Sequence, residues 1–184
     1  MVKFHPDVNN NLVSTLEKEG AETVVPDMTD FINYCMFDNI YKHKYLAGSF
    51  KNKVMSLIAS GYIERLRSVI RKMLKKSSHF NSYQTTNALA HKASDIISVC
   101  NQTGEGWLLT AEILELIEYG VNNIICVQPF GCLLNHITGK GVMKELKRRY
   151  KNINITAIDY DPGASEVNQI NRIKLLMSVV HQKN

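Results

Sequence analysis

The C-terminal third of the chain alternates between short apolar runs and amphipathic segments, and this alternation restricts the possible folds. Residues 121–128, VNNIICVQ, contain an unbroken apolar run of the kind found in buried parallel strands. Residues 141–150, GVMKELKRRY, have the spacing of an amphipathic helix, and residues 153–161, INITAIDYD, form a second strand-like run. A strand, a helix and a strand in this order predict a right-handed parallel crossover.

A second strand–helix–strand pattern opens the chain. Residues 1–6 and 21–27 have the character of strands, and residues 7–20 between them that of a helix. Residues 28–100 show helical spacing without a convincing strand. We therefore predict an α/β fold: a four-stranded, mainly parallel sheet with helices on both faces and a helical insertion between strands two and three. The length of 184 residues suits a single domain, 1–184.

The composition is that of a soluble globular protein and not of a membrane protein, and the sequence does not support secretion. The chain is 45% apolar and 21% charged, as in globular proteins, and no apolar run approaches the roughly 20 residues of a membrane-spanning helix. The N-terminal segment lacks the apolar stretch of a secretion signal. The four cysteines show neither a CxxC motif nor a metal-binding spacing, which predicts reduced thiols and a cytoplasmic protein. We expect Cys35, Cys100 and Cys126 to be buried structural residues.

Much of the net charge of +5 comes from a basic segment, residues 62–76. Its apolar residues recur at helical spacing, which predicts a surface helix with a buried stripe and a solvated basic face. Binding of a phosphate, such as that of a CoA-type ligand, is the alternative, because rows of cations attract polyanions. RLRSVIRKMLKK has no interleaved aromatics, so no nucleic acid is expected. The predicted buried stripe is Ile63, Leu66, Ile70 and Leu74, and the predicted outward residues are Arg67, Arg71 and Lys75.

The candidate site lies in VQPFGCLLNHITGKG, which joins the strand-like run at 121–128 to the next helix. In parallel α/β sheets, ligands bind outside the carboxyl ends of strands, near the point where the strand order reverses. For a strand order 2-1-3-4, the loops that begin at His5 and at Gln128 meet at that point. Cys132 lies in the second of these loops, and His136 follows four residues later.

Several roles are open to Cys132 and His136 from this local pattern. A thiolate here could bind iron or zinc, or attack a substrate with the histidine as its base. A separation of four residues allows two ligands to converge on one metal, but two ligands do not complete a site, and no second pair stands elsewhere in the chain. A neutral histidine in a loop also commonly caps a turn.

Three further segments have both a structural and a functional interpretation. Glu105, in TGEGW, lies near a predicted helix start, where a carboxylate is favourable. Asp159 and Asp161, at the end of the last predicted strand, either bind magnesium or begin a helix with Pro162 in its first turn. The GKG at 139–141 resembles a phosphate-binding turn in outline, without the P-loop spacing.

Two long segments carry a resemblance to one family. VQPFGCLLNHITGKGVMKELKRRY and NINITAIDYDPGASEVNQINRIKLLM are similar to the C-terminal region of the large acyl-CoA dehydratase activase-related proteins. These are proteins of anaerobes, related to the 2-hydroxyacyl-CoA dehydratases and benzoyl-CoA reductases. KFHPDVNNNLV, EGAETVVPD and TGEGWLLTAEI also resemble segments of that family. The resemblance covers nearly the whole chain and is weakest over residues 42–85.

The resemblance implies a dehydratase-subunit-like α/β fold and a cysteine-ligated [4Fe–4S] cluster that receives electrons from an ATP-hydrolysing activator module. Cys132 matches the family's cysteine after QPFG, and this makes it the implied cluster ligand. Leu134 stands where the family pattern has proline. The residues expected to line the site with Cys132 are His5, Glu105, Gln128, Asn135 and His136.

A cluster normally needs about four thiolates, and only one cysteine is well placed. The chain also begins within the first predicted strand. We therefore expect a fragment of a longer multidomain protein, inactive and without its cluster in isolation. The parent protein would be a dehydratase, reductase or activase acting on an acyl-CoA. The alternative is a non-catalytic α/β module that binds a partner protein or a CoA-type ligand through its basic helix.

Overall fold

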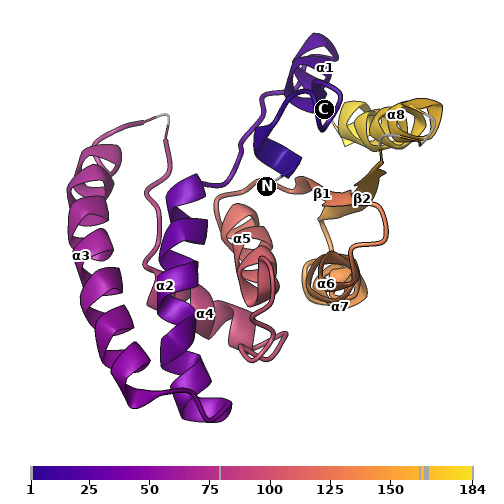
Figure 1. Cartoon of the computed structure of the whole chain (residues 1–184). Helices are drawn as coiled ribbons and strands as arrows, with labels where there is room; N and C mark the ends of the chain where they lie inside the picture. The colour runs from indigo at the N-terminus through magenta and orange to yellow at the C-terminus, as the bar shows by residue number, and fades with distance from the viewer. Residues whose placement is uncertain (1, 79, 162, 164–165, 184) are drawn as a thin grey trace. The chain divides into compact units, whose positions relative to one another are not determined.

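The chain divides into two compact units in the computed structural model (Figure 1). One consists of Met1–Val25 together with Gly120–Asn184 and is called the sheet unit here. The other is the intervening Pro26–Tyr119, the helical unit. The structure describes residues 2–78, 80–161, 163 and 166–183, so Pro162, expected in a first helical turn, lies outside the described residues.

The sheet unit is built around two parallel strands. β1 (Asn123–Pro129) pairs with β2 (Asn154–Tyr160) in register along their whole length. Alternate residues of β1 are buried, because one face of the pair packs against other elements. α8 (Glu166–Lys183) packs beside β2. The core of this unit contains Leu12, Ile158, Tyr160, Ile173, Leu176 and Met177.

Short helical elements complete the sheet unit. The connection between the strands contains α6 (Leu133–Asn135), the π-helical turn η2 (His136–Lys140) and α7 (Met143–Arg149). The N-terminal segment contributes the 3-10 turn η1 (Val2–Phe4), which lies beside β1, and α1 (Leu12–Lys18).

The predicted four-stranded sheet with helices on both faces is wrong, because the sheet formed by the described residues has two strands. Residues 2–4 form a turn instead of a strand. The Asn9 side-chain amide donates hydrogen bonds to the carbonyls of Val2 and Lys3, at 3.0 and 3.4 Å, and so occupies acceptors that a strand would use. Residues 21–27 carry β-branched side chains, but no strand pairs with them in the described part of the chain.

The described part of the helical unit, residues 26–78 and 80–119, contains four helices. They are α2 (Met28–Tyr45), α3 (Phe50–Leu74), α4 (Thr86–Ser94) and α5 (Gly106–Glu118). α2 packs along α3, and α4 packs against α5 (Figure 1). The core of this unit contains Tyr34, Leu89, Ala90, Ala93, Val99, Trp107, Leu108 and Ala111. No helix among the described residues has the length and apolar content needed to cross a bilayer.

A glycine at the start of α5 allows the aromatic core of the helical unit to form. Trp107 is fully buried and packs edge-on to the Tyr34 ring, with 5.1 Å between ring centroids. The Tyr34 hydroxyl donates to the Gln102 carbonyl at 2.8 Å. Gly106 has a φ of +46°, and a Cβ there would collide with the Asn101 carbonyl oxygen and the Tyr34 hydroxyl.

The orientation predicted for the basic segment is wrong in the middle of α3, whereas Lys75 is exposed as predicted. Arg67, expected to point outward, is only 2% exposed, whereas Leu66 and Ile70, expected to be buried, are 53% and 46% exposed. The face that packs on α2 includes the buried side chains of Ser56 and Ser60. Small side chains let two helices approach closely, and buried charges on α2 hold the arginine on the same side.

Candidate functional site

Cys132 lies just beyond the carboxyl end of β1, at the start of α6. Gly131, with a φ of +69°, lets the chain turn sharply away from the strand. The Cys132 N–H then donates to the Pro129 carbonyl at 3.2 Å, which closes the turn. The Cys132 side chain is partly exposed, while Cys126, within β1, is buried. Cys132 is therefore the more accessible of the two thiols of the sheet unit.

His136 folds back on Cys132. Its backbone N–H and its ring Nδ1 both bond to the Cys132 carbonyl oxygen, at 3.0 and 2.8 Å. A carbonyl oxygen only accepts, so Nδ1 carries the proton, and Nε2 of the neutral ring keeps its lone pair. Metal-binding histidines often have this arrangement, with one ring N–H on a backbone carbonyl. His136 caps the turn and leaves Nε2 as a potential ligand or base.

Polar side chains join the ends of both strands to the loop that follows η1. The amide of the buried Gln128 donates to the Asp159 carboxylate, and the Gln169 amide donates to the Asp159 carbonyl at 3.2 Å. Asn10 in turn donates to Gln169 Oε1 at 2.8 Å. The Gln128 side-chain oxygen has no hydrogen-bond partner in the described structure and remains an open buried acceptor. The loop after His5 therefore reaches the carboxyl edge of β2 through Asn10.

The other predicted site residues lie in different settings. His5 is exposed, and its carbonyl accepts from the N–H groups of Val8 and Asn9 at 3.1 and 3.2 Å. Asn135 is buried within α6. Glu105 belongs to the helical unit, where it immediately precedes α5.

The two other segments with open interpretations form local turns. Asp161 accepts from the Gly163 N–H at 3.3 Å, which is a turn of the kind expected after a strand. At Gly141 a Cβ would lie 2.6 Å from the Ile137 carbonyl oxygen, so this glycine permits a close approach between η2 and the chain leading into α7. Both observations favour the structural interpretation of these segments.

The ligands for a complete metal site are not assembled in the described part of the chain, which contains no group of three or more His, Cys, Asp or Glu residues able to hold an ion. Cys35, predicted to be buried, is exposed on α2, and Cys100 is partly exposed. Cys132 therefore fits one ligand position of a [4Fe–4S] cluster, and the full set of about four thiolates does not fit the residues present.

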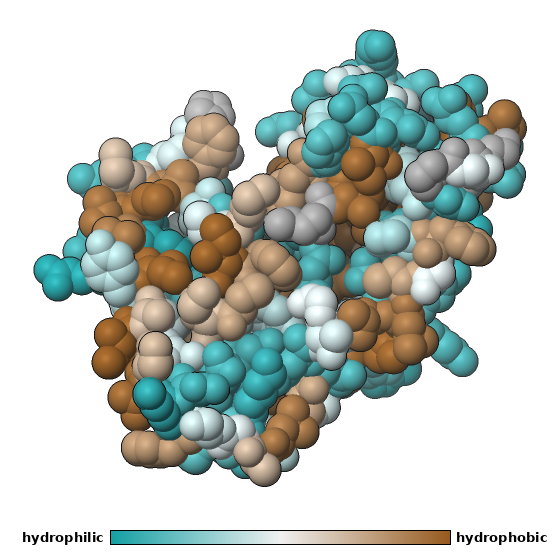
Figure 2. All heavy atoms as spheres, in the orientation of Figure 1, coloured by the Kyte–Doolittle hydropathy of each residue, from teal (hydrophilic) through white to brown (hydrophobic). Residues whose placement is uncertain are grey.

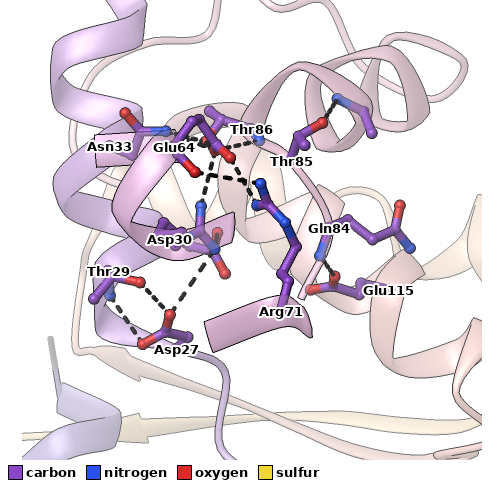
Figure 3. Close-up of polar contacts among 12 residues, drawn as sticks. Asp27, Thr29, Asp30, Asn33, Glu64, Arg71, Gln84, Thr85, Thr86 and Glu115 are labelled. Carbon is purple, nitrogen blue, oxygen red and sulfur yellow. Dashed lines mark hydrogen bonds and ion pairs between the residues drawn. The ribbon is translucent and has the colours of Figure 1, made fainter. Parts of the chain in front are cut away.

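The helical unit contains a buried network of charged residues that the sequence analysis missed (Figure 3). Arg67 of α3 donates through Nη2 to Asp30 of α2 and through Nη1 to Glu64 at 3.1 Å. Burial raises the pKa of Asp30 to about 7, and the attraction of Arg67 offsets only part of this increase.

Glu64 connects three helices of the helical unit. Its carboxylate accepts from Arg71 at 2.7 Å, from the backbone N–H of Thr86 at 3.1 Å and from Asn33 at 2.9 Å (Figure 3). Burial alone would raise the pKa of Glu64, but these hydrogen bonds outweigh burial and lower it. Because these partners come from α2, α3 and the start of α4, we interpret the network as a structural connection between helices.

A sequence signal for this network does exist. Glu64, Arg67 and Arg71 are spaced by three and four residues, so they share one face of α3. Only the position of the acids on α2 shows that this charged face is the buried one. Comparisons of the chain with protein-family models, curated proteins and solved structures found no match.

Proposed function

We propose that the sheet unit supplies Cys132 as one ligand of a [4Fe–4S] cluster, in a protein related to the acyl-CoA dehydratase activases. The observation that carries this proposal is the position of the thiol. Cys132 is partly exposed directly after the carboxyl end of β1, where parallel α/β structures bind ligands. A buried cysteine such as Cys126 cannot serve in this way without opening the sheet.

The turn around Cys132 supports a ligand role because it holds the backbone in one conformation. The Cys132 N–H is bonded to Pro129, and the Cys132 carbonyl accepts two hydrogen bonds from His136. A ligand fixed in this way loses little conformational freedom when it binds a metal. The free Nε2 of His136 is close in sequence and is a second candidate donor.

The remaining thiolate ligands must come from outside the described residues, because Cys132 supplies only one thiolate and no group of three or more potential ligands is assembled among those residues. We propose that other domains of a longer protein, or a partner subunit, supply them. The resemblance further suggests an ATP-hydrolysing activator module, an acyl-CoA substrate and a cytoplasmic location. A bound cluster would provide one-electron transfer, and this chain alone would be inactive.

Iron analysis of the assembled protein tests the proposal. The protein that contains this sequence, together with its partner domains, is purified anaerobically as wild type, Cys132→Ser and Cys100→Ser. We expect Cys132→Ser to lose most of the iron and most of the electron paramagnetic resonance signal of the reduced cluster. Cys100→Ser, which also replaces a partly exposed thiol, should keep both.

Two results would contradict the proposal. The first is an equal iron content in wild type and Cys132→Ser, and the second is the absence of iron from the assembled wild-type protein. Loss of iron from both variants would indicate a general loss of structure, which circular dichroism on the same samples would detect. His136→Gln, which can still donate to the Cys132 carbonyl, distinguishes a ligand role of Nε2 from a capping role of Nδ1.

A further inference from the structure

The outer face of α3 carries a continuous row of exposed apolar side chains, the α3 stripe. Its members range from 53% exposed at Leu66 to 70% exposed at Ile58. Successive members are three or four residues apart, so they follow one face of the helix for about 27 Å, at 1.5 Å per residue. The α3 stripe consists of Met55, Ile58, Tyr62, Leu66, Val69 and Met73.

This row is separate from the face of α3 that forms the helical unit. The residues buried against the rest of the unit are Ser56, Ser60 and Arg67, which lie on the other side of the helix. Figure 2 shows hydrophobic residues gathered over α3 at the left of the view. Proteins that act alone rarely expose an apolar row of this length, because it remains in contact with water.

The charges around the α3 stripe have one sign. Six basic residues and a single acid, Glu64, occur in α3, and Glu64 is bonded to Arg67 and Arg71. The basic residues Lys51, Arg65 and Lys72 are exposed, and in the described part of the chain no ion pair involves them. The apolar row therefore lies among cations that have no acidic partner of their own.

We infer that the α3 stripe docks an amphipathic helix that bears Asp or Glu beside its own apolar row. Apolar residues at spacings of three and four form the seam of a two-helix contact, and flanking charges select the partner. Met55, Met73 and Tyr62 suit such a seam, since methionine adapts its shape and tyrosine adds a large contact area.

Two other occupants are separated from an acidic helix by charge and by the test below. A second copy of α3 would bring cations against cations, which like-charge repulsion disfavours. An anionic lipid surface would meet the same cations and an apolar face that also includes the exposed Val54 and Ile70, so binding to vesicles is measured beside binding of the peptides. The inference does not depend on the cluster proposal, because none of the residues involved lies in the sheet unit.

The test uses the complete chain and a labelled, designed helical peptide with leucine at the seam positions and glutamate beside them. A second peptide has lysine in place of every glutamate. Fluorescence anisotropy at low ionic strength measures both affinities. We expect the glutamate peptide to bind at least about 10-fold more tightly than the lysine peptide, and to bind less tightly as salt screens the charges.

Two pairs of variants locate the binding surface. Ile58→Glu/Val69→Glu places charges within the α3 stripe, and its control, Val167→Glu/Leu175→Glu, changes equally exposed apolar residues of α8. Arg65→Glu/Lys72→Glu reverses the flanking charge, and its control, Lys144→Glu/Lys147→Glu, makes the same change in charge on α7. We expect each α3 variant to weaken binding about 10-fold or more, and each control to leave it within about 2-fold.

Any of four results would overturn the inference. The first is equal affinity for both peptides, and the second is unchanged affinity of the α3 variants for the glutamate peptide. The third is a dimer of the chain that the substitutions Ile58→Glu/Val69→Glu dissociate. The fourth is binding of the chain to phosphatidylglycerol vesicles without binding of the glutamate peptide. The third would identify a second copy as the occupant, and the fourth a lipid surface. All substituted side chains are exposed, so the variants should keep their helical circular dichroism.

Discussion

Arg67 of α3 donates a hydrogen bond to Asp30 of α2 although both side chains are almost completely buried. The two side chains form an ion pair at the interface between α2 and α3, the two longest helices of the helical unit. The guanidinium also bonds to Glu64, which has Arg71 as a second cation, so removal of Arg67 would leave Asp30 as the buried carboxylate that loses its cation.

We therefore expect Arg67→Met to lower the free energy of unfolding by about 3 kcal/mol, as when one partner of a buried pair is removed. Urea denaturation near pH 8 measures this loss. The control is Arg65→Met, an exposed arginine on the same helix, which should cost less than about 0.5 kcal/mol. The cost of Arg67→Met should be smaller near pH 5, because Asp30, with its raised pKa, then carries a proton. Equal costs for Arg67→Met and Arg65→Met would show that the network contributes little.

Asp38 predicts a pH dependence of stability. Burial raises its pKa from 3.8 to about 7, and Lys42 offsets only part of this change. The folded protein binds this proton more tightly than the unfolded chain does, so the stabilisation is complete below pH about 4 and is lost as pH rises through about 7.

The Asp38→Asn variant cannot release this proton. Its free energy of unfolding relative to wild type should therefore increase by about 2 kcal/mol between pH 4 and pH 8, after allowance for solvent screening. Urea titrations of both proteins at several pH values provide the measurement. A difference that stays constant over this range would mean that Asp38 titrates alike in the folded and unfolded chain.

Replacement of two glycines of the helical unit by alanine should change the stability of the protein in opposite directions. A Cβ at Gly106 would collide with Asn101 and Tyr34, and its φ of +46° is unfavourable for alanine. We expect Gly106→Ala to destabilise the protein by more than about 2 kcal/mol. A Cβ at Gly61, inside α3, would have open space for 4 Å around it, so Gly61→Ala should stabilise by about 0.5–1 kcal/mol. Thermal unfolding of both variants measures the two changes in stability. If Gly61→Ala were destabilised, the added methyl group would have to collide with a neighbouring residue on that side of α3.

The two thiols of the sheet unit should differ in reactivity. Under native conditions iodoacetamide should modify the partly exposed Cys132 before the buried Cys126. Peptide mass spectrometry at a series of times gives the two rates, and denaturation in urea should make them similar. Faster modification of Cys126 in the folded protein would remove the structural basis for Cys132 as a cluster ligand.

The parallel pair of strands was accessible from sequence, because each strand is a compact apolar run bounded by polar turns. Ile124 and Ile155, near the start of the two strands, are buried, and they are partners in the register of β1 and β2. The N-terminal segment was misjudged for a physical reason. Asn9 lies seven residues from Val2, and nothing in the local pattern indicates that its amide occupies the carbonyls of the expected strand.

The orientation of α3 was also beyond the local pattern. Helical spacing predicts a helix and an apolar row, but a row can face a core or a partner with the same spacing. Leu66 and Arg67 are neighbours in sequence, and which of them is buried depends on Asp30, more than thirty residues earlier. For the candidate site, the sequence located Cys132 in the turn after β1, whereas the two bonds from His136 to one carbonyl required the structure.

The division of the sheet unit into two stretches of sequence has a consequence for biosynthesis. Leu12 packs in the same core as Ile158 and Ile173, which the ribosome adds only after the entire helical unit has been made. The helical unit is a continuous stretch and can acquire its structure while translation continues. Until then, the apolar side chain of Leu12 in residues 2–25 stays exposed to solvent. Ribosome-associated chaperones could therefore bind this segment until β2 and α8 have been synthesised.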